Sequence, residues 1–276
     1  MKRATFFLIA IVLLSTTVIG YAEITPTEVN PTETSLAKAS ESKEKKLGIT
    51  FDLTYMSKYM SLGGEGFGQQ GGLFETIDVD LWGSGFGIAI GHQSATSSGY
   101  VDKRRFNYNV YYKNSAFDGS AYKMDYKFNW RYEHYYDRAR SVGNTQEWTL
   151  AFSWPDILPI ENLTPYYIFD FEHPAGSNYN NNDISGSAHV FGLAYKWNVE
   201  QLTNPIKLSI DTTFRDGLGG GAVDHDWSHA TLGISTKFNI TDNLSFVPGL
   251  YHQITMDESV CKRDVTYCKL SLKYKF

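Results

Sequence analysis

Apolar and polar side chains alternate strictly over long stretches of this chain. Residues 122–133 place six apolar residues, five of them aromatic, between six polar or charged ones, and residues 268–276 alternate up to the final Phe276. A period of two puts successive side chains on opposite faces of a β-strand. One aromatic, apolar face opposite a charged face is typical of a barrel strand that meets lipid outside and water inside. The pattern therefore predicts a transmembrane β-barrel.

The same alternation recurs along most of the chain and predicts an all-β, antiparallel barrel of about 12 strands over residues 46–276. An even number of strands brings both ends of a single-chain barrel to the same side of the membrane. The expected strands cover residues 49–58, 73–81, 86–90, 105–113, 122–133, 147–154, 166–172, 189–198, 206–215, 229–238, 244–254 and 267–276.

The connections between these strands alternate in length. Outer-membrane barrels have short periplasmic turns and longer, polar extracellular loops. Short connections are expected at residues 83–84, 115–120 and 241–243, and long ones at 61–72, 95–103, 174–187, 216–226 and 257–264. Pro155, Pro159 and Pro165 are expected together in one periplasmic turn, where a missing N–H group does not interrupt a strand ladder.

The N-terminus has the features of a secretory signal peptide. Lys2 and Arg3 precede an apolar run over residues 6–14, and a small-residue cleavage site ends at Ala22. Residues 23–45 are rich in Thr, Ser, Glu, Lys and Pro without an apolar period, which predicts a disordered periplasmic tail. Residues 1–22 would then direct the chain to the outer membrane of a Gram-negative bacterium.

Charge and cysteine content narrow the function classes. The formal net charge is −5, and cleavage after Ala22 would remove Lys2 and Arg3 and leave −7. No basic patch is present, so nucleic acid is not an expected partner. Cys261 and Cys268 are the only cysteines, and a pair in an exported chain predicts a disulfide at the extracellular rim.

No cofactor or metal is expected. The glycine-rich segments at residues 63–68 and 217–221 precede no helix that could hold a phosphate. His225, Asp226 and His229 have side chains that can bind a metal, but three such residues at the base of a loop are more commonly solvated.

The inward-facing positions of the expected strands carry many charged residues of both signs. A barrel of about 12 strands lies between solidly packed 8-stranded barrels and open 16-stranded porins. The lumen is therefore either a narrow polar pore for small polar solutes or a closed, salt-bridged interior, depending on whether a long loop such as 174–187 folds inward. The expected pore-lining residues are Asp52, Lys58, Asp78, Asp80, Arg105, Lys123, Asp125, Lys127, Arg131, Glu133, Glu147, Asp170, Lys207, Asp211 and Arg215.

One group of outward-facing residues offers an alternative function. A two-residue turn at Gly83 and Ser84, closed by Trp82 and Gly85, would place Glu75 opposite His92, with Ser94 two residues further along the same face. Ser94 as nucleophile, His92 as base and Glu75 as orienting carboxylate would form an acyl-transfer site. Polar residues at headgroup level, with no catalytic role, are the simpler explanation, because they cost little near the interface.

The spacing from His92 to Ser94 resembles the His-x-Ser element of the outer-membrane phospholipase and lipid A deacylase barrels. That resemblance implies an outer-leaflet lipid hydrolase. The Asn-Gly pair that follows the phospholipase serine is replaced here by Ala95 and Thr96.

The opening of the expected barrel resembles the TorF-like outer-membrane porin family. The similar segments are the tyrosine-rich residues 55–59 followed by Gly63, and residues 77–86, which end in a Gly-Phe step. An arginine usual in the family's first loop is missing, with Leu62 nearby. The resemblance implies a transport barrel in contact with outer-membrane lipid and lipopolysaccharide, and the terminal Phe276 is similar to the aromatic residue recognised by the barrel-assembly machinery. A binding role of the long loops remains open.

Overall fold

The computed structural model describes residues 47–98, 104–136, 143–176, 185–218 and 225–276. The predicted signal peptide (1–22) and tail (23–45) lie outside these ranges. Among the described residues, no helix combines the length and the apolar character needed to cross a membrane.

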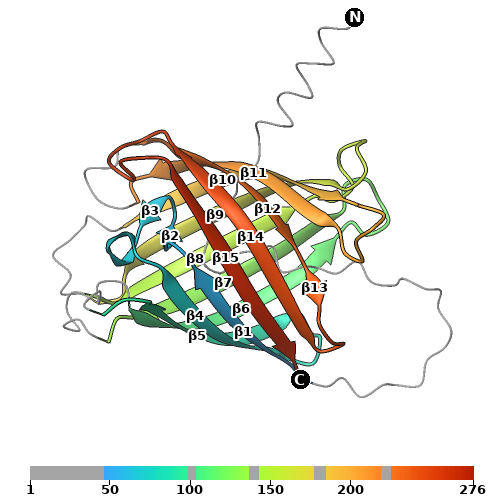
Figure 1. Cartoon of the computed structure of the whole chain (residues 1–276), viewed down its shortest axis with the longest axis horizontal. Coiled ribbons are helices and arrows are strands. Elements are labelled where there is room, and N and C mark those ends of the chain that lie inside the picture. The colour runs from blue at the N-terminus through green and yellow to red at the C-terminus, as the bar shows by residue number, and fades with distance from the viewer. Residues whose placement is uncertain (1–46, 99–103, 137–142, 177–184, 219–224) are drawn as a thin grey trace, which may run out of the picture.

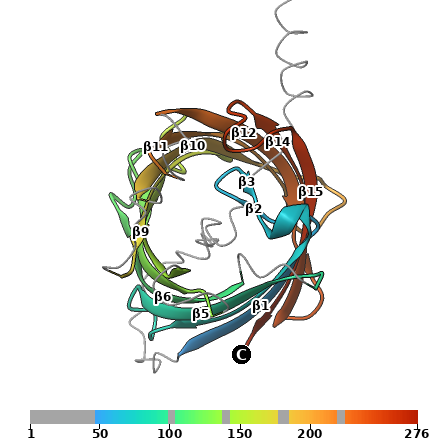
Figure 2. The ribbon, with the colours of Figure 1, turned by 90° about the vertical axis from the view of Figure 1, so that its left-hand side faces the viewer.

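The described residues form a closed antiparallel β-barrel of 12 long strands (Figures 1 and 2), which confirms the predicted fold class. The barrel closes where β1 pairs with β15, in register from Thr50 opposite Lys275 to Met56 opposite Lys269. The long strands are β1 (Gly48–Met56), β4 (Gly72–Asp80), β5 (Phe86–Ala95), β6 (Arg105–Ala116), β7 (Met124–His134), β8 (Thr145–Ser153), β9 (Leu163–Pro174), β10 (Gly186–Trp197), β11 (Ile206–Asp216), β12 (Asp226–Thr236), β14 (Leu244–Thr255) and β15 (Val265–Lys275).

Three short strands and one turn of 3-10 helix complete the described elements. These are β2 (Met60–Ser61), β3 (Gly64–Glu65), η1 (Phe67–Gln69) and β13 (Phe238–Asn239). The pairing of β14 passes from β12 to β13 with a break beside Pro248, which has no N–H group to donate. Pro165 also differs from expectation, because it lies in β9 near its start rather than in the preceding turn.

The period-two pattern produces continuous rows of outward side chains around the barrel. In one row, Ile88 lies opposite Val110, Val110 opposite Trp130, Trp130 opposite Trp148, and Trp148 opposite Phe171. Apolar and aromatic cross-strand neighbours of this kind stabilise the sheet beyond its backbone hydrogen bonds. The outer face of the barrel is consequently apolar across successive strands.

The first hairpin has the register that the sequence predicted. Glu75 pairs with His92 and Leu73 with Ser94. The turn itself lies one residue earlier than the predicted Gly83-Ser84 pair: Trp82 (φ 59°) and Gly83 (φ 61°) both adopt the left-handed conformation, and Ser84 N donates to Leu81 O at 3.1 Å. Two residues with positive φ match the right-handed twist of the flanking strands.

The two ends of the barrel differ in the length of their connections. Residues 81–85, 117–123, 154–162, 198–205 and 240–243 link the strands at the short-turn end, and the other connections lie at the long-loop end. At the long-loop end, residues 57–71 between β1 and β4, here called loop L1, fold into the barrel instead of projecting from it (Figure 2).

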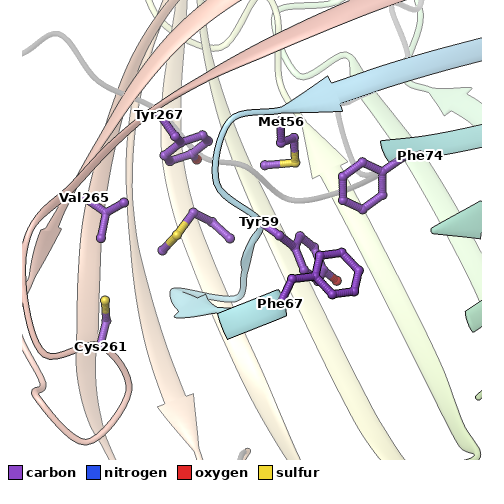
Figure 3. Close-up of a cluster of buried hydrophobic side chains, with 8 residues drawn as sticks. Met56, Tyr59, Phe67, Phe74, Cys261, Val265 and Tyr267 are labelled. Atoms are coloured by element: carbon purple, nitrogen blue, oxygen red, sulfur yellow. The ribbon is translucent and has the colours of Figure 1, made fainter. Parts of the chain in front are cut away.

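Loop L1 contributes Tyr59, Met60 and Phe67 to a cluster of buried hydrophobic side chains inside the described part of the barrel (Figure 3). The Tyr59 ring lies 4.9 Å from the Phe67 ring and 5.1 Å from the Phe74 ring, measured between centroids. Burying these side chains stabilises the inward position of L1, because each aromatic side chain removed from water contributes favourably to folding. The buried members are Met56, Tyr59, Met60, Phe67, Phe74, Cys261, Val265 and Tyr267.

The predicted disulfide between Cys261 and Cys268 is absent, because both cysteines are free. Cys261 is buried in the cluster inside the barrel, where its thiol contacts Arg263 O at 3.2 Å. Cys268 lies opposite the exposed Leu250 on the outer face of the wall. The prediction was wrong because the loop before β15 turns Cys261 inward, so that the two side chains are on different sides of the sheet.

We therefore expect two free thiols with different accessibility. Alkylation of the folded chain without reductant should modify Cys261 slowly, because its side chain is buried, and unfolding in denaturant should expose both thiols. Intact-mass measurement before and after unfolding tests this. Resistance of both cysteines to alkylation in unreduced, unfolded protein would show that they are bonded after all.

Candidate functional site: the barrel interior

A buried chain of alternating charges runs along the inner wall formed by β6, β7 and β8. Arg105 Nη2 lies 2.6 Å from Glu133 Oε1, and Arg131 Nη1 lies 2.9 Å from Glu147 Oε2. Arg131 Nη1 is also 3.7 Å from Glu133 Oε1, which joins the two pairs. All four side chains are buried. Strand register places Arg131 directly opposite Glu147, whereas Arg105 reaches Glu133 diagonally, since Glu133 lies opposite Asn107.

Neutral groups satisfy the remaining polar atoms of this network. Thr145 donates to Glu133 at 2.8 Å, and Thr149 donates to Asp170 on β9 at 3.3 Å. Tyr135, just beyond β7, donates to Glu133 Oε2 at 3.0 Å. Burial raises the pKa of Tyr135 well above its ordinary value, so its hydroxyl keeps the proton that it donates. The network is therefore hydrogen-bonded as well as charge-paired, as buried ionic groups require.

Smaller ion pairs line the interior toward the short-turn end. Lys273 Nζ lies 3.1 Å from Asp52, and Lys113 Nζ lies 3.1 Å from Asp80. These side chains are partly exposed rather than buried. The inner wall is thus polar along both halves, with its most buried charges in the half nearer the long loops.

Further polar contacts lie toward the short-turn end. Tyr111 donates to Asp78 at 3.0 Å, and the Lys127 ammonium group lies 4.5 Å from the centroid of the Tyr111 ring. Ser115 donates to Asp125 at 2.5 Å.

Loop L1 spans the interior and is bonded to opposite parts of the wall. On one side, Gln93 of β5 donates to the Tyr59 hydroxyl at 3.2 Å. On the other, Arg215 donates to Leu62 O and Gln253 donates to Gly63 O, the latter at 2.8 Å. These contacts place L1 across the lumen.

The tip of L1 is closely fitted to the wall. Leu62 packs against the buried Tyr166, Ile168 and Val190 of β9 and β10. Gly63 has φ +85° and no room for a side chain, because a Cβ atom there would meet the His229 ring. Glycine is needed at this position both for its backbone conformation and for the close approach. The long loop that folds inward among the described residues is therefore L1, whereas residues 177–184 of the predicted loop 174–187 lie outside the described residues.

The predicted pore-lining residues fall into three locations. Lys58 is in L1, and Lys123 lies in the turn before β7, 3.6 Å from Asp118, so that it is not on a strand of the wall. The others occupy inward positions of the strands: Asp52, Asp78, Asp80, Arg105, Asp125, Lys127, Arg131, Glu133, Glu147, Asp170, Lys207, Asp211 and Arg215.

Several neutral residues take part in the interior without having been expected there. Tyr59, Gln93 and Gln253 hold L1 in place. Only one weak feature of the sequence indicates that this loop lies in the interior. Tyr59 and Phe67 are large apolar residues within a glycine-rich loop, which is unusual for a loop that projects into water.

The outward residues Glu75, His92 and Ser94 are not assembled as a catalytic triad. Glu75 Oε2 lies 3.0 Å from His92 Nδ1, as an orienting carboxylate would. His92 Nε2, the nitrogen that would accept the serine proton, instead lies 3.0 Å from the Tyr136 hydroxyl. Within the described ranges no hydrogen bond joins Ser94 to His92.

The histidines near β12 do not form a metal site in the described part of the chain. His225 pairs with Asp216, while His229 is buried and its Nδ1 lies 2.7 Å from the Ser228 hydroxyl. No group of three or more His, Cys, Asp or Glu side chains suited to a metal ion occurs among the described residues.

Comparison with known proteins finds similarity only at the level of structure. No family model and no curated sequence matches the chain, so the resemblance to the TorF-like family is not confirmed. Similar solved structures include a KdgM porin (10% identity, TM-score 0.48, 82% of this chain and 99% of that one) and a NanC porin (7%, 0.49, 83% and 100%). LpxR from Salmonella typhimurium is also similar (9%, 0.41, 82% and 100%). At such low identities and TM-scores, these likenesses carry no functional inference for this chain.

Proposed function

We propose that this protein is an outer-membrane channel through which small polar solutes pass passively. The observation that carries the proposal is the division of the wall into an apolar outer face and a charged inner face. The charged inner face provides hydrogen-bonding groups along the lumen, as an aqueous path requires. Loop L1 crosses this lumen, so the proposed path is narrow.

The outer face supports insertion of the barrel into a membrane. Large apolar side chains are exposed on the consecutive strands β4, β5 and β6 (Ile77, Ile90 and Val110) and also on β14 (Leu250), each of them about half exposed. A soluble monomer rarely exposes a contiguous apolar surface of this extent. Aromatic residues are exposed near the short-turn end, where they match the interfacial girdle of an outer-membrane barrel: Trp82, Phe86, Tyr122, Trp197, Phe238 and Phe276.

A lysine introduced in the middle of the outer face should destabilise the inserted barrel. Ile90 is the middle of β5 and is 51% exposed. At the bilayer midplane, Ile90→Lys should lower the free energy of unfolding by roughly 2–4 kcal/mol. A lysine introduced near an interface, as in Phe86→Lys, should lower it by no more than about 1 kcal/mol. Denaturant titration of the protein in lipid vesicles measures the free energy of unfolding of both variants. Equal costs would contradict the proposed position of the membrane.

Solute uptake by proteoliposomes tests the proposed function. Vesicles that contain the folded, mature chain should take up small polar solutes faster than empty vesicles, with uptake falling as solute size increases. Heat-denatured protein at the same lipid ratio provides the control. Uptake no faster than in empty vesicles would refute passive passage.

The exposed C-terminus is proposed to serve barrel assembly. Phe276 is 74% exposed and its ring centroid lies 4.8 Å from that of Tyr274. We propose that the barrel-assembly machinery recognises this terminal aromatic residue.

An outer-leaflet hydrolase is not proposed, because the proton-accepting nitrogen of His92 is occupied by Tyr136.

A further inference from the structure

Three buried side-chain oxygens on the inner wall have no hydrogen-bond partner. The three oxygens are Asp211 Oδ1 and Thr213 Oγ1 on β11, and Thr231 Oγ1 on β12. The exposed fractions of these residues are 2%, 0% and 1%. The fourth buried side-chain atom without a partner among the described residues is Arg215 Nε, in a guanidinium group whose other nitrogens donate to Leu218 O and Leu62 O. Buried polar atoms are nearly always satisfied in folded proteins, so three orphan oxygens at one place indicate that a water molecule, a ligand or an ion belongs there.

Strand register brings the three oxygens onto one small area. Asp211 lies directly opposite Thr231, and Thr213 follows Asp211 by two residues on the same inward face. Directly opposed side chains have Cβ atoms about 4.5–5.5 Å apart, and diagonal neighbours remain within reach of one another. A single small ligand between them can therefore contact all three oxygens. We call Asp211, Thr213 and Thr231 the Asp211 site.

Asp211 differs from the buried Glu133 and Glu147 because no cation of the described chain forms an ion pair with it. Glu133 and Glu147 each pair with an arginine, whereas Asp211 accepts only a hydrogen bond from the Tyr166 hydroxyl, at 2.7 Å. Tyr166 reaches Asp211 because the intervening Gly192 has no side chain, and a Cβ atom there would collide with the Tyr166 ring. A buried carboxylate with one neutral partner favours the binding of a positive charge.

Loop L1 covers the neighbourhood of this site. Leu62 packs on Tyr166, and Gly63 O accepts a hydrogen bond from Gln253, which lies opposite Thr231 on β14. Arg215, four residues from Asp211 toward the long-loop end, donates to the carbonyl groups of Leu62 and Leu218. The site is thus enclosed between the tip of L1 and the wall.

We propose that the Asp211 site binds a small, hard metal cation. Its orphan ligands are all oxygen atoms, one carboxylate and two hydroxyls, which is the chemistry that Ca²⁺ and similar cations prefer and that softer metals do not. A proton on Asp211 would neutralise the carboxylate but would leave the two threonine oxygens unsatisfied. The proposal goes beyond a channel function, since a cation can bind here whether or not the barrel conducts.

Terbium luminescence tests the site in the full, folded chain in detergent. Tb³⁺ replaces Ca²⁺ at oxygen sites, and a tyrosine beside the bound ion sensitises its emission. Because Tyr166 is hydrogen-bonded to Asp211, we expect saturable emission that excess CaCl₂ abolishes. Asp211→Asn should reduce the emission at a fixed Tb³⁺ concentration severalfold. Asp52→Asn, which removes an inward carboxylate already paired with Lys273, should leave it unchanged.

Two results would overturn the proposal. One is the absence of saturable emission from the folded wild-type chain, and the other is equal emission from the wild-type and Asp211→Asn chains. If Asp211→Asn fails to fold, Thr231→Val, which keeps the side-chain volume and removes one orphan oxygen, should weaken binding severalfold. Unchanged binding in Thr231→Val would then contradict the site. Equilibrium binding is independent of solute uptake, so failure here and failure of the channel function are distinguishable.

Discussion

Shortening loop L1 should increase the permeability of the barrel severalfold. Replacing residues 58–70 with a short Gly-Ser linker removes the segment that crosses the lumen between Gln93 and Gln253. The wall should persist, because β1 pairs with β15 and with β4 independently of the loop. Proteoliposome uptake should become faster and should admit larger solutes than the wild-type chain does.

The matched control for this experiment leaves L1 intact and removes only contacts that a neighbouring loop makes with its exposed edge. Arg263→Ala removes exposed contacts to Glu65 and Gln69 but leaves the bonds at Leu62 and Gly63 intact. Its uptake should stay close to wild type. If the shortened chain folds and its uptake and size limit equal those of the wild type, L1 is not the constriction.

Removing Arg131 should strongly destabilise the barrel. Glu147 would lose the ion pair at 2.9 Å and remain buried. An uncompensated buried charge costs roughly 3–5 kcal/mol, so Arg131→Met should lower the free energy of unfolding by that order. Denaturant titration of the protein in lipid vesicles gives this quantity.

Two companion variants identify charge as the cause. Arg131→Met combined with Glu147→Gln should recover much of the loss, because the unpaired carboxylate is removed as well. Lys273→Met breaks the partly exposed ion pair with Asp52 and should lower the free energy of unfolding by no more than about 1 kcal/mol. A double variant no more stable than Arg131→Met would show that packing, rather than charge, explains the loss.

The wall of the barrel was largely predictable from the sequence. The period of two determines which side chains face inward, and the position of the first tight turn determines the register, as in the pairing of Glu75 with His92. The residues at which the strands begin and end were less predictable than their register. Lys123 continues the alternation of β7 but lies in the preceding turn, because chain reversal after Phe117 takes up residues that would otherwise extend the strand.

The segments and contacts inside the barrel were not predictable from the period of two. Loop L1 has no hydrophobic period, and its inward fold depends on contacts with residues far away in the sequence, such as Arg215 and Gln253. The position of Cys261 depends on the same cluster, so counting cysteines could not reveal that its side chain turns away from Cys268. The alternation of side chains along β11 also predicted that Asp211 faces inward. It could not show that no cation among the described residues forms an ion pair with Asp211.

Single-channel recording in planar bilayers tests the proposed channel most directly. We expect the folded, mature wild-type chain to produce discrete current steps, and the chain with shortened L1 to produce larger ones. Insertion of both proteins without any current steps would contradict the proposed channel, since the charged inner wall would then not line a continuous path.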